Sequence, residues 1–182
     1  FSSEMTHILK DFKVGVIGVS GTGSIVTESL ARLGVGHLVL IDDDVIEHKN
    51  LNRILNSTIQ DAENQRVKVD VITNAIRGYR SDIELTALNC KIGTHEAILE
   101  AATCDVLFCC VDTVSARMYV DLINEFFLLP VFDIGVTIPT ALRDGQTFIT
   151  EVCARLDYIQ PHKSSLRDRK VYTSASLNAE YL

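Results

Sequence analysis

The residues best able to do chemistry follow the ends of apolar segments. The first apolar run, KVGVIG, leads into a glycine-rich stretch at residues 18–24, which contains Gly18, Gly21 and Gly23, and has Ser20 where a G-x-G-x-x-G motif has its second glycine. Glycines let backbone N–H groups approach a phosphate closely, and the N-terminus of a following helix favours negative charge. The stretch therefore predicts a nucleotide site. The alternative is a tight turn from strand to helix that binds no ligand.

Acidic residues follow a second apolar run. Asp42 comes directly after HLVLI, 19 residues after Gly23, which is the usual place for a carboxylate that accepts hydrogen bonds from ribose hydroxyls. On these two features alone, an oxidoreductase-type domain that binds NAD or FAD is the leading hypothesis. The alternative for Asp42 is a solvent-exposed carboxylate in a turn.

Charged residues later in the chain favour a different ligand. Asp44, Arg53, Lys68 and Asp112 can converge with Asp42 if the apolar runs form a parallel sheet, because the carboxyl ends of such strands share one edge. Two cations neutralise phosphate charge, and carboxylates hold Mg²⁺ and ribose, so this set suits a triphosphate. Hydride transfer requires neither. Taken singly, the Lys and the Arg are better explained as solvated charges, but together they favour a phosphate site.

Alternating strands and helices must position these residues. A helix is expected over residues 63–78, which would carry Lys68, and another over residues 22–33. The alternation predicts a parallel sheet covered on both faces, that is, a doubly wound, Rossmann-like α/β fold. The apolar runs expected to form strands are residues 13–18, 37–42, 83–88, 105–111 and 130–136.

The pattern changes after residue 136. Two β-segments, residues 136–142 and 146–152, follow without an intervening helix, and Asp144-Gly145 between them is typical of a hairpin turn. We therefore expect a mostly parallel sheet with an antiparallel β extension at the C-terminal end. Residues 1–152 are expected to form one nucleotide-binding domain. The more polar residues 153–182 are expected to pack on that domain or to be swapped from a second copy of it.

Composition and charge limit the possible classes. The 182 residues include 17 basic and 24 acidic side chains, and a net charge of −7 argues against a general nucleic-acid binder. The longest apolar run, residues 106–111, is far shorter than the about 18 residues that cross a bilayer, and we expect neither a membrane span nor a signal peptide. The five cysteines are an odd number, and four lie in or beside apolar segments. This indicates thiols in a reducing, cytoplasmic compartment.

Four stretches together resemble the ThiF/MoeB-like domain of the ubiquitin-activating enzyme superfamily. They are GVSGTGS (18–24), LIDDDVIEHKNLNR (40–53), QRVKV (65–69) and CCVDTVSAR (109–117), and the resemblance covers about residues 12–152. It implies a doubly wound fold that uses MgATP to adenylate the C-terminal carboxylate of a ubiquitin-like or sulfur-carrier protein, usually one ending in glycine, with release of pyrophosphate. It also implies a homodimer.

The resemblance assigns a role to each matching residue. Asp42 would hold the ribose, and Asp112 would sit at the Mg²⁺. Arg53, Lys68 and Asp112 are the expected catalytic residues, because attack at the α-phosphate requires positioning and charge neutralisation as pyrophosphate leaves. The acceptor carboxylate is already a nucleophile near neutral pH and needs no side-chain base. The residues expected to bind the nucleotide are Gly18, Ser20, Gly21, Gly23, Asp42, Asp44, Asn50, Arg53 and Lys68.

The sequence departs from the family in three places. Ser20 replaces the usual second glycine of the loop. Residues 165–168, where a C-x-x-C zinc pair would fall, are Ser-Leu-Arg-Asp, so a structural zinc site is not expected. Cys153, late in the chain, is interpreted as a small buried residue rather than a thioester or persulfide carrier. These departures leave open a second alternative, an interaction module of the same fold that has lost turnover.

Overall fold

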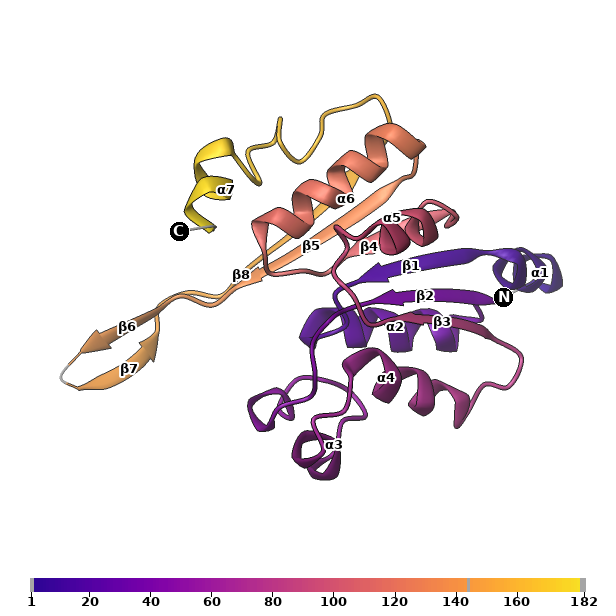
Figure 1. The fold of residues 1–182 in the computed structure, drawn as a ribbon, viewed down its shortest axis with the longest axis horizontal. Helices are drawn as coiled ribbons and strands as arrows, with labels where there is room; N and C mark the ends of the chain where they lie inside the picture. The colour runs from indigo at the N-terminus through magenta and orange to yellow at the C-terminus, as the bar shows by residue number, and fades with distance from the viewer. Residues whose placement is uncertain (1, 144, 181–182) are drawn as a thin grey trace.

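A six-stranded sheet forms the centre of the computed structural model, which describes residues 2–143 and 145–180 (Figure 1). The strand order is β3-β2-β1-β4-β5-β8, with parallel pairing from β3 through β5 and antiparallel pairing of β8 with β5. This confirms the doubly wound, mostly parallel sheet. The strands are β1 (Lys13–Ile17), β2 (His37–Ile41), β3 (Glu84–Leu88), β4 (Val106–Cys109), β5 (Val131–Thr137) and β8 (Cys153–Ile159).

Helices cover both faces of the sheet (Figure 1). Helices α2 and α4 pack on one face, while α5 and α6 pack on the other and α7 lies against α6. None of the helices in residues 2–143 and 145–180 combines the length and the apolar character needed to cross a bilayer. The helices are α1 (Ser3–Asp11), α2 (Gly21–Leu33), α3 (Ile59–Glu63), α4 (Lys68–Arg77), α5 (His95–Ala101), α6 (Val114–Phe127) and α7 (Ser174–Glu180), with a 3₁₀ turn at His48–Asn50.

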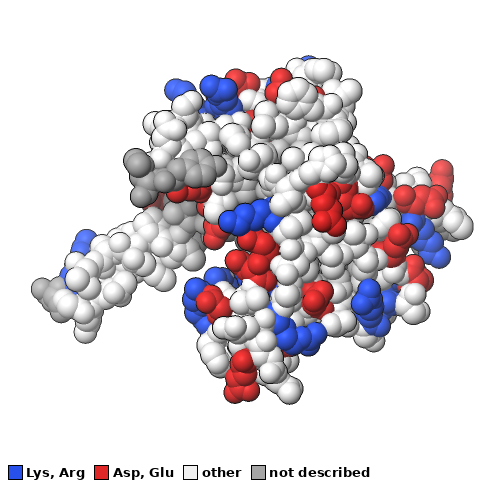
Figure 2. Space-filling view, viewed as in Figure 1, with Lys and Arg blue, Asp and Glu red and all other residues white. Residues whose placement is uncertain are grey.

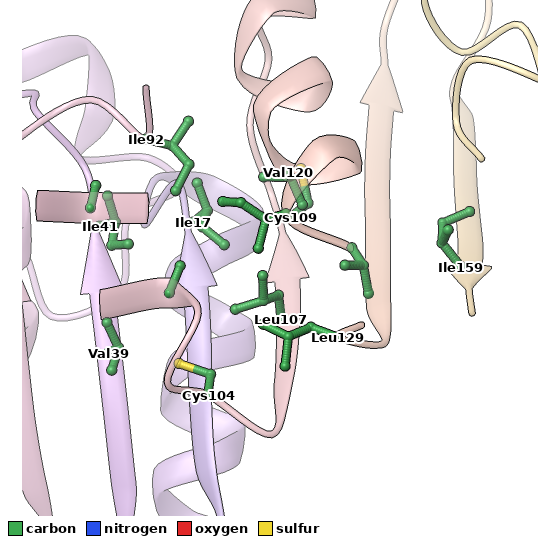
Figure 3. Close-up of a cluster of buried hydrophobic side chains, with 14 of the residues drawn as sticks. Ile17, Val39, Ile41, Ile92, Cys104, Leu107, Cys109, Val120, Leu129 and Ile159 are labelled. Carbon is green, nitrogen blue, oxygen red and sulfur yellow. The ribbon is translucent and has the colours of Figure 1, made fainter. Parts of the chain in front are cut away.

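The core lies on both sides of the sheet because successive strand side chains point to opposite faces. In β2, Leu38 and Leu40 pack in the cluster under α2 and α4, whereas Val39 and Ile41 pack in the cluster under α5 and α6. Figure 3 shows the second cluster, in which Val39 and Ile41 lie with side chains from β1, β4 and α6. Burial on both faces explains why these strands are continuous apolar runs in the sequence.

The parallel strands end in register at one edge of the sheet. Ile17, the last residue of β1, pairs with Ile41, the last residue of β2, and with Cys109, the last residue of β4. Cys109 in turn pairs with Asp133 of β5. The segments that follow β1, β2 and β4 therefore leave the sheet side by side. The chain after β1 continues into α2 on one face of the sheet, whereas the chain after β4 continues into α6 on the other face. Ligands bind at such a point in open α/β folds.

An antiparallel hairpin lies in the chain between β5 and β8, and forms a separate two-stranded sheet. It consists of β6 (Thr140–Arg143) and β7 (Gln146–Ile149) and projects from the body of the molecule (Figure 1). This confirms the antiparallel extension, although Asp144, in the expected turn, lies outside the described residues. The interpretation of Cys153 as a buried residue is wrong, because it is exposed at the first position of β8.

The helix expected over residues 63–78 begins later, at Lys68. Residues before it turn instead: Gln65 has a φ of 47°, and Val67 forms an isolated antiparallel bridge with Val45. The bridge ties the segment after β2 to the start of α4. It therefore places Lys68 in the first turn of a helix beside the acidic residues that follow β2.

Candidate active site

The glycine loop brings β1 and α2 into close contact. Gly18 has a φ of +80°, and its N–H donates to the carbonyl of Ile41 at 2.8 Å. A Cβ on Gly23 would lie 1.8 Å from the carbonyl oxygen of Gly18, so only glycine fits at that position. Ser20 is the N-cap of α2, and its carbonyl accepts from the N–H of Ser24 at 2.8 Å. The loop thus presents backbone and the N-terminus of α2 at the edge of the sheet, as phosphate binding requires.

Asp42 connects this loop to the end of β2. One carboxylate oxygen, Oδ2, accepts from the N–H of Val19 at 2.8 Å, and the other, Oδ1, accepts from the N–H of Asp44 at 3.0 Å. The side chain is only 8% exposed. Burial raises the pKa of Asp42, while the Lys68 ammonium and these two backbone N–H groups oppose the rise. The carboxylate predicted to hold a ribose is therefore also a structural brace of the glycine loop.

Lys68 is the buried cation of the site. Its side chain is 5% exposed, and its Nζ lies 2.6 Å from Asp44 Oδ2 and 3.8 Å from Asp42 Oδ1. A buried ammonium has to be paired, because its desolvation is otherwise too costly. Asp44, however, is 68% exposed. A phosphate could therefore take the place of Asp44 as the close partner of Lys68, because the displaced Asp44 carboxylate is already exposed to solvent.

Arg53 lies beside the glycine loop. A Cβ on Gly21 would lie 3.1 Å from Arg53 Cδ, and Arg53 Nη1 donates to the carbonyl of Lys49 at 2.9 Å. Together with the first turn of α2, residues 51–57 line an open groove of about 640 Å³. Arg53 therefore lies beside the loop glycines, as predicted, and its side chain is exposed.

Asn50 has a local partner. Its side chain is buried, and its Oδ1 accepts from the N–H of Glu47 at 3.0 Å, which closes a capping box on the 3₁₀ turn. Asn50 thereby fixes the turn that carries Arg53. A direct contact between Asn50 and a phosphate remains a prediction.

Asp112 follows β4 and is exposed. The chain passes directly over the glycine loop before it reaches this residue, because a Cβ on Gly18 would lie 2.9 Å from the carbonyl oxygen of Cys110 and 3.1 Å from Val111 Cγ1. Backbone hydrogen bonding continues the register, since Cys110 N–H donates to the carbonyl of Ile17 at 2.8 Å. Asp112 thus stands at the same edge as the glycine loop.

A buried ion-pair network beside the site was missed from the sequence. Asp133 of β5 is fully buried and accepts from Arg117 Nε at 3.2 Å and from Arg155 of β8. Arg155 also pairs with Asp157 on its own strand. The signal that could have found the network is Asp133 itself, because a charged residue within an apolar strand segment requires a buried partner.

The donor chemistry of the site fits Mg²⁺ only in company with phosphate. Within residues 2–143 and 145–180, no group of three or more His, Cys, Asp or Glu residues is arranged to hold a metal ion. Mg²⁺ is usually bound by one or two carboxylates together with substrate phosphates and water. The exposed Asp112 beside the glycine loop offers such a carboxylate.

The segment where a zinc pair would fall is closed by hydrogen bonds. Ser165 N–H donates to Asp168 Oδ2 at 3.0 Å, and Asp168 N–H donates to Ser165 Oγ at 3.1 Å. Asp121 of α6 accepts from the N–H of Leu166 at 2.8 Å. This turn is therefore anchored to the domain by side-chain carboxylates, and the prediction that zinc is not needed here stays a prediction.

The sequence matches the ThiF family over residues 1–164. The chain belongs to the ThiF family. It is 30% identical over 125 residues to ubiquitin-like modifier-activating enzyme 5 of Xenopus laevis, a match that covers 62% of this chain and 31% of that enzyme. It is 37% identical over 114 residues to the sulfur carrier protein ThiS adenylyltransferase of Escherichia coli K12, covering 62% of this chain and 44% of that protein. The match thus covers less than half of each relative.

Solved structures show the same fold. E. coli MccB with AMPCPP and MccA superposes with a TM-score of 0.75 at 21% sequence identity, covering 97% of this chain and 49% of MccB. A structure of MccB with ATP gives a TM-score of 0.74 at 20% identity, covering 98% of this chain and 50% of MccB. At these identities the likeness establishes the ThiF/MoeB-like architecture alone.

Proposed function

We propose that this ThiF domain uses ATP to adenylate the C-terminal carboxylate of a ubiquitin-like or sulfur-carrier protein, with release of pyrophosphate. A carboxylate oxygen attacks the α-phosphorus, and the bond from that phosphorus to the oxygen bridging to the β-phosphate breaks. Pyrophosphate leaves with the electron pair. The relatives of the chain support this reaction, since two of them are named as a modifier-activating enzyme and an adenylyltransferase.

The observation that carries the proposal is the pairing of Lys68 at the sheet edge. This buried ammonium lies 2.6 Å from an exposed carboxylate, Asp44, beside the glycine loop. Triphosphate chemistry requires a cation that can neutralise charge as pyrophosphate leaves, whereas hydride transfer does not. The arrangement and the family membership therefore favour ATP over NAD or FAD.

We assign the remaining parts of the site in the same way. The backbone of Gly18, Ser20 and Gly21 would line the phosphates. The Asp42 carboxylate would accept hydrogen bonds from the ribose hydroxyls. Arg53 would neutralise phosphate charge from the groove side. Asp112 would hold Mg²⁺, whose bound form adds further charge neutralisation. Asn50 would contact a phosphate as well as fix the turn that carries Arg53. Gly23 would allow the close approach of α2 to β1, and Asp44 would hold Lys68 until the nucleotide binds.

The proposed partner is a small protein that ends in glycine, because a C-terminal glycine has no side chain to obstruct the approach of its carboxylate to the nucleotide. We further propose that the protein works as a homodimer, as the resemblance implies, and in the cytoplasm, as its cysteine content indicates. The observed charge distribution is compatible with this role: Figure 2 shows acidic and basic side chains interspersed over the visible face.

The test is pyrophosphate exchange into ATP by the full-length protein, with NAD binding measured in parallel by calorimetry. The proposal predicts exchange that depends on a glycine-ended acceptor protein and heat of binding with ATP only. Tight NAD binding without exchange would instead support the oxidoreductase hypothesis. Acceptor binding that persists in Arg53→Ala and Lys68→Ala variants, with no ATP-dependent step in the parent, would support a module without turnover.

A further inference from the structure

The loop between β4 and α6 carries Asp112 and is held by a side chain from the helix that follows it. Arg117, the fourth residue of α6, donates from Nη2 to the carbonyl of Val111 at 2.6 Å. Val111 directly precedes Asp112 in the chain. The hydrogen bond is charge-assisted and short, so it restrains the backbone at the point where the carboxylate leaves it.

Arg117 is itself fixed by the core. Its Nε lies 3.2 Å from Oδ1 of Asp133, and the two side chains are 14% and 0% exposed. Gly135 lies beside the guanidinium, since a Cβ built there would be in ordinary contact with Arg117 Nη2 at 3.5 Å. A planar guanidinium with several donors can bind the Asp133 carboxylate and a carbonyl at the same time, whereas an ammonium cannot span both in the same geometry.

The anchor of this arrangement belongs to the sheet. Asp133 pairs in register with Cys109, the last residue of β4, so the fixed end of the bridge and the start of the loop share one row of the sheet. The path therefore runs from the buried carboxylate of Asp133 through the Arg117 guanidinium to the carbonyl of Val111. The sheet fixes the Asp133 carboxylate, the ion pair with Asp133 fixes the Arg117 guanidinium, and the hydrogen bond from Arg117 fixes the Val111 carbonyl.

We propose that Arg117 is a positioning residue of the nucleotide site: by bridging Asp133 and the Val111 carbonyl, it fixes Asp112 for Mg²⁺ bound with ATP. The inference rests on the proposed function, because it takes Asp112 as the carboxylate that meets the metal. Partners of this kind, which orient a metal-binding group without touching the metal, change metal affinity by about 10- to 100-fold when they are lost.

Arg155 provides a matched control. It pairs with the same carboxylate, Asp133, which joins β8 to β5, and with Asp157 within β8. Neither of these ion pairs involves the loop that carries Asp112. Arg117→Lys and Arg155→Lys therefore each keep a cation beside Asp133. Only the first substitution removes the second donor that reaches Val111.

Two measurements on the full-length protein test the inference. Calorimetry measures the affinity for ATP as a function of Mg²⁺ concentration, and hydrogen exchange measures the protection of residues 110–115. We expect Arg117→Lys to raise the Mg²⁺ concentration needed for half-maximal ATP affinity by about tenfold or more and to reduce protection of this segment, while Arg155→Lys changes neither. In an Asp112→Asn background, Arg117→Lys should have no further effect on the Mg²⁺ dependence, since the two residues act as one unit.

The results separate the inference from the proposed function. Unchanged Mg²⁺ dependence in Arg117→Lys, or an equal change in Arg155→Lys, would overturn the positioning role. Wild-type protein that binds ATP with Mg²⁺ but never exchanges pyrophosphate would refute the proposed reaction, and the binding data would still decide the role of Arg117. Wild-type protein that binds no ATP would refute both.

Discussion

Replacing Gly23 by alanine is the most informative small change in the nucleotide site. The added Cβ would lie 1.8 Å from the carbonyl oxygen of Gly18 and 2.8 Å from its carbonyl carbon, and both atoms belong to the backbone. A side-chain neighbour could rotate away, but this backbone cannot. Alanine otherwise favours a helix over glycine by about 1 kcal/mol, so any loss has to come from the contact.

The size of the displacement follows from the same distance. A Cβ essentially never approaches another heavy atom within 3.0 Å, so the glycine loop and the first turn of α2 must separate by about 1.2 Å from the 1.8 Å of the native backbone. A misplacement of about 1 Å at a reacting group can cost about 10²-fold in rate. We therefore expect Gly23→Ala to lower pyrophosphate exchange by about 10²-fold.

Gly21→Ala is the control on the same helical turn. Its added Cβ would lie 3.1 Å from Arg53 Cδ, which belongs to a flexible, exposed side chain that can shift by a few tenths of an ångström. Because Gly21 and Arg53 both belong to the proposed site, we expect some loss of exchange, but a clearly smaller one than in Gly23→Ala. Exchange rates and ATP affinity would be measured for both variants, with circular dichroism to show that each is folded. Equal activity of folded Gly23→Ala and wild-type protein would refute the role given to the loop.

Three further changes test other parts of the account. Lys68→Ala should lower exchange by about 10²-fold or more, because the site loses its buried cation; exposed Lys49→Ala, as the control, should leave the exchange rate unchanged. Asp133→Ala should lower the free energy of unfolding by about 3–5 kcal/mol, since it leaves buried guanidinium charge unpaired; a urea midpoint equal to that of wild type would contradict the network. Although burial opposes its ionisation, hydrogen bonds from Thr58 lower the pKa of Asp61. The stability that it contributes is therefore present above about pH 4 and is lost as the pH falls through the lowered value, and urea titrations of Asp61→Asn should lack this loss.

Much of the fold could be predicted because burial leaves a direct trace in the sequence. The central strands are buried on both faces, so they appear as continuous apolar runs, and β1 ends at a glycine loop that signals the start of α2. Asp42 was predictable for the same reason, since a carboxylate directly after such a strand stands at the edge of the sheet.

The remaining features depend on contacts between distant residues. Lys68 is buried because the bridge between Val45 and Val67 brings Asp44 to it, and no local pattern encodes that pairing. Strand β8 was not predicted because it is an edge strand with polar and apolar side chains mixed, and its place is set by pairing with β5. The ion pair of Lys68 and the pairing of β8 with β5 both depend on how distant parts of the chain meet in the fold, so neither can be read from the residues of one segment.

The hydrogen bond between Arg117 and Val111 illustrates the same limit at the site. The sequence places the Arg five residues after Asp112, and this spacing does not indicate a contact with the loop. The structure shows that it reaches back to the preceding loop and inward to β5 at once. The bridging role of Arg117 could be predicted only if the position of Asp133 in the sheet, next to the end of β4, were already known.

The proposed reaction leaves adenylate on the C-terminal carboxylate of a glycine-ended protein. Mass spectrometry of such an acceptor, incubated with the full-length protein, ATP and Mg²⁺, detects this product. We expect an acceptor heavier by one adenylate, attached at its terminal glycine and lost in the Lys68→Ala variant. An acceptor that stays unmodified while the protein binds ATP, or an adduct that forms equally on an acceptor with an amidated C-terminus, would refute the proposed reaction.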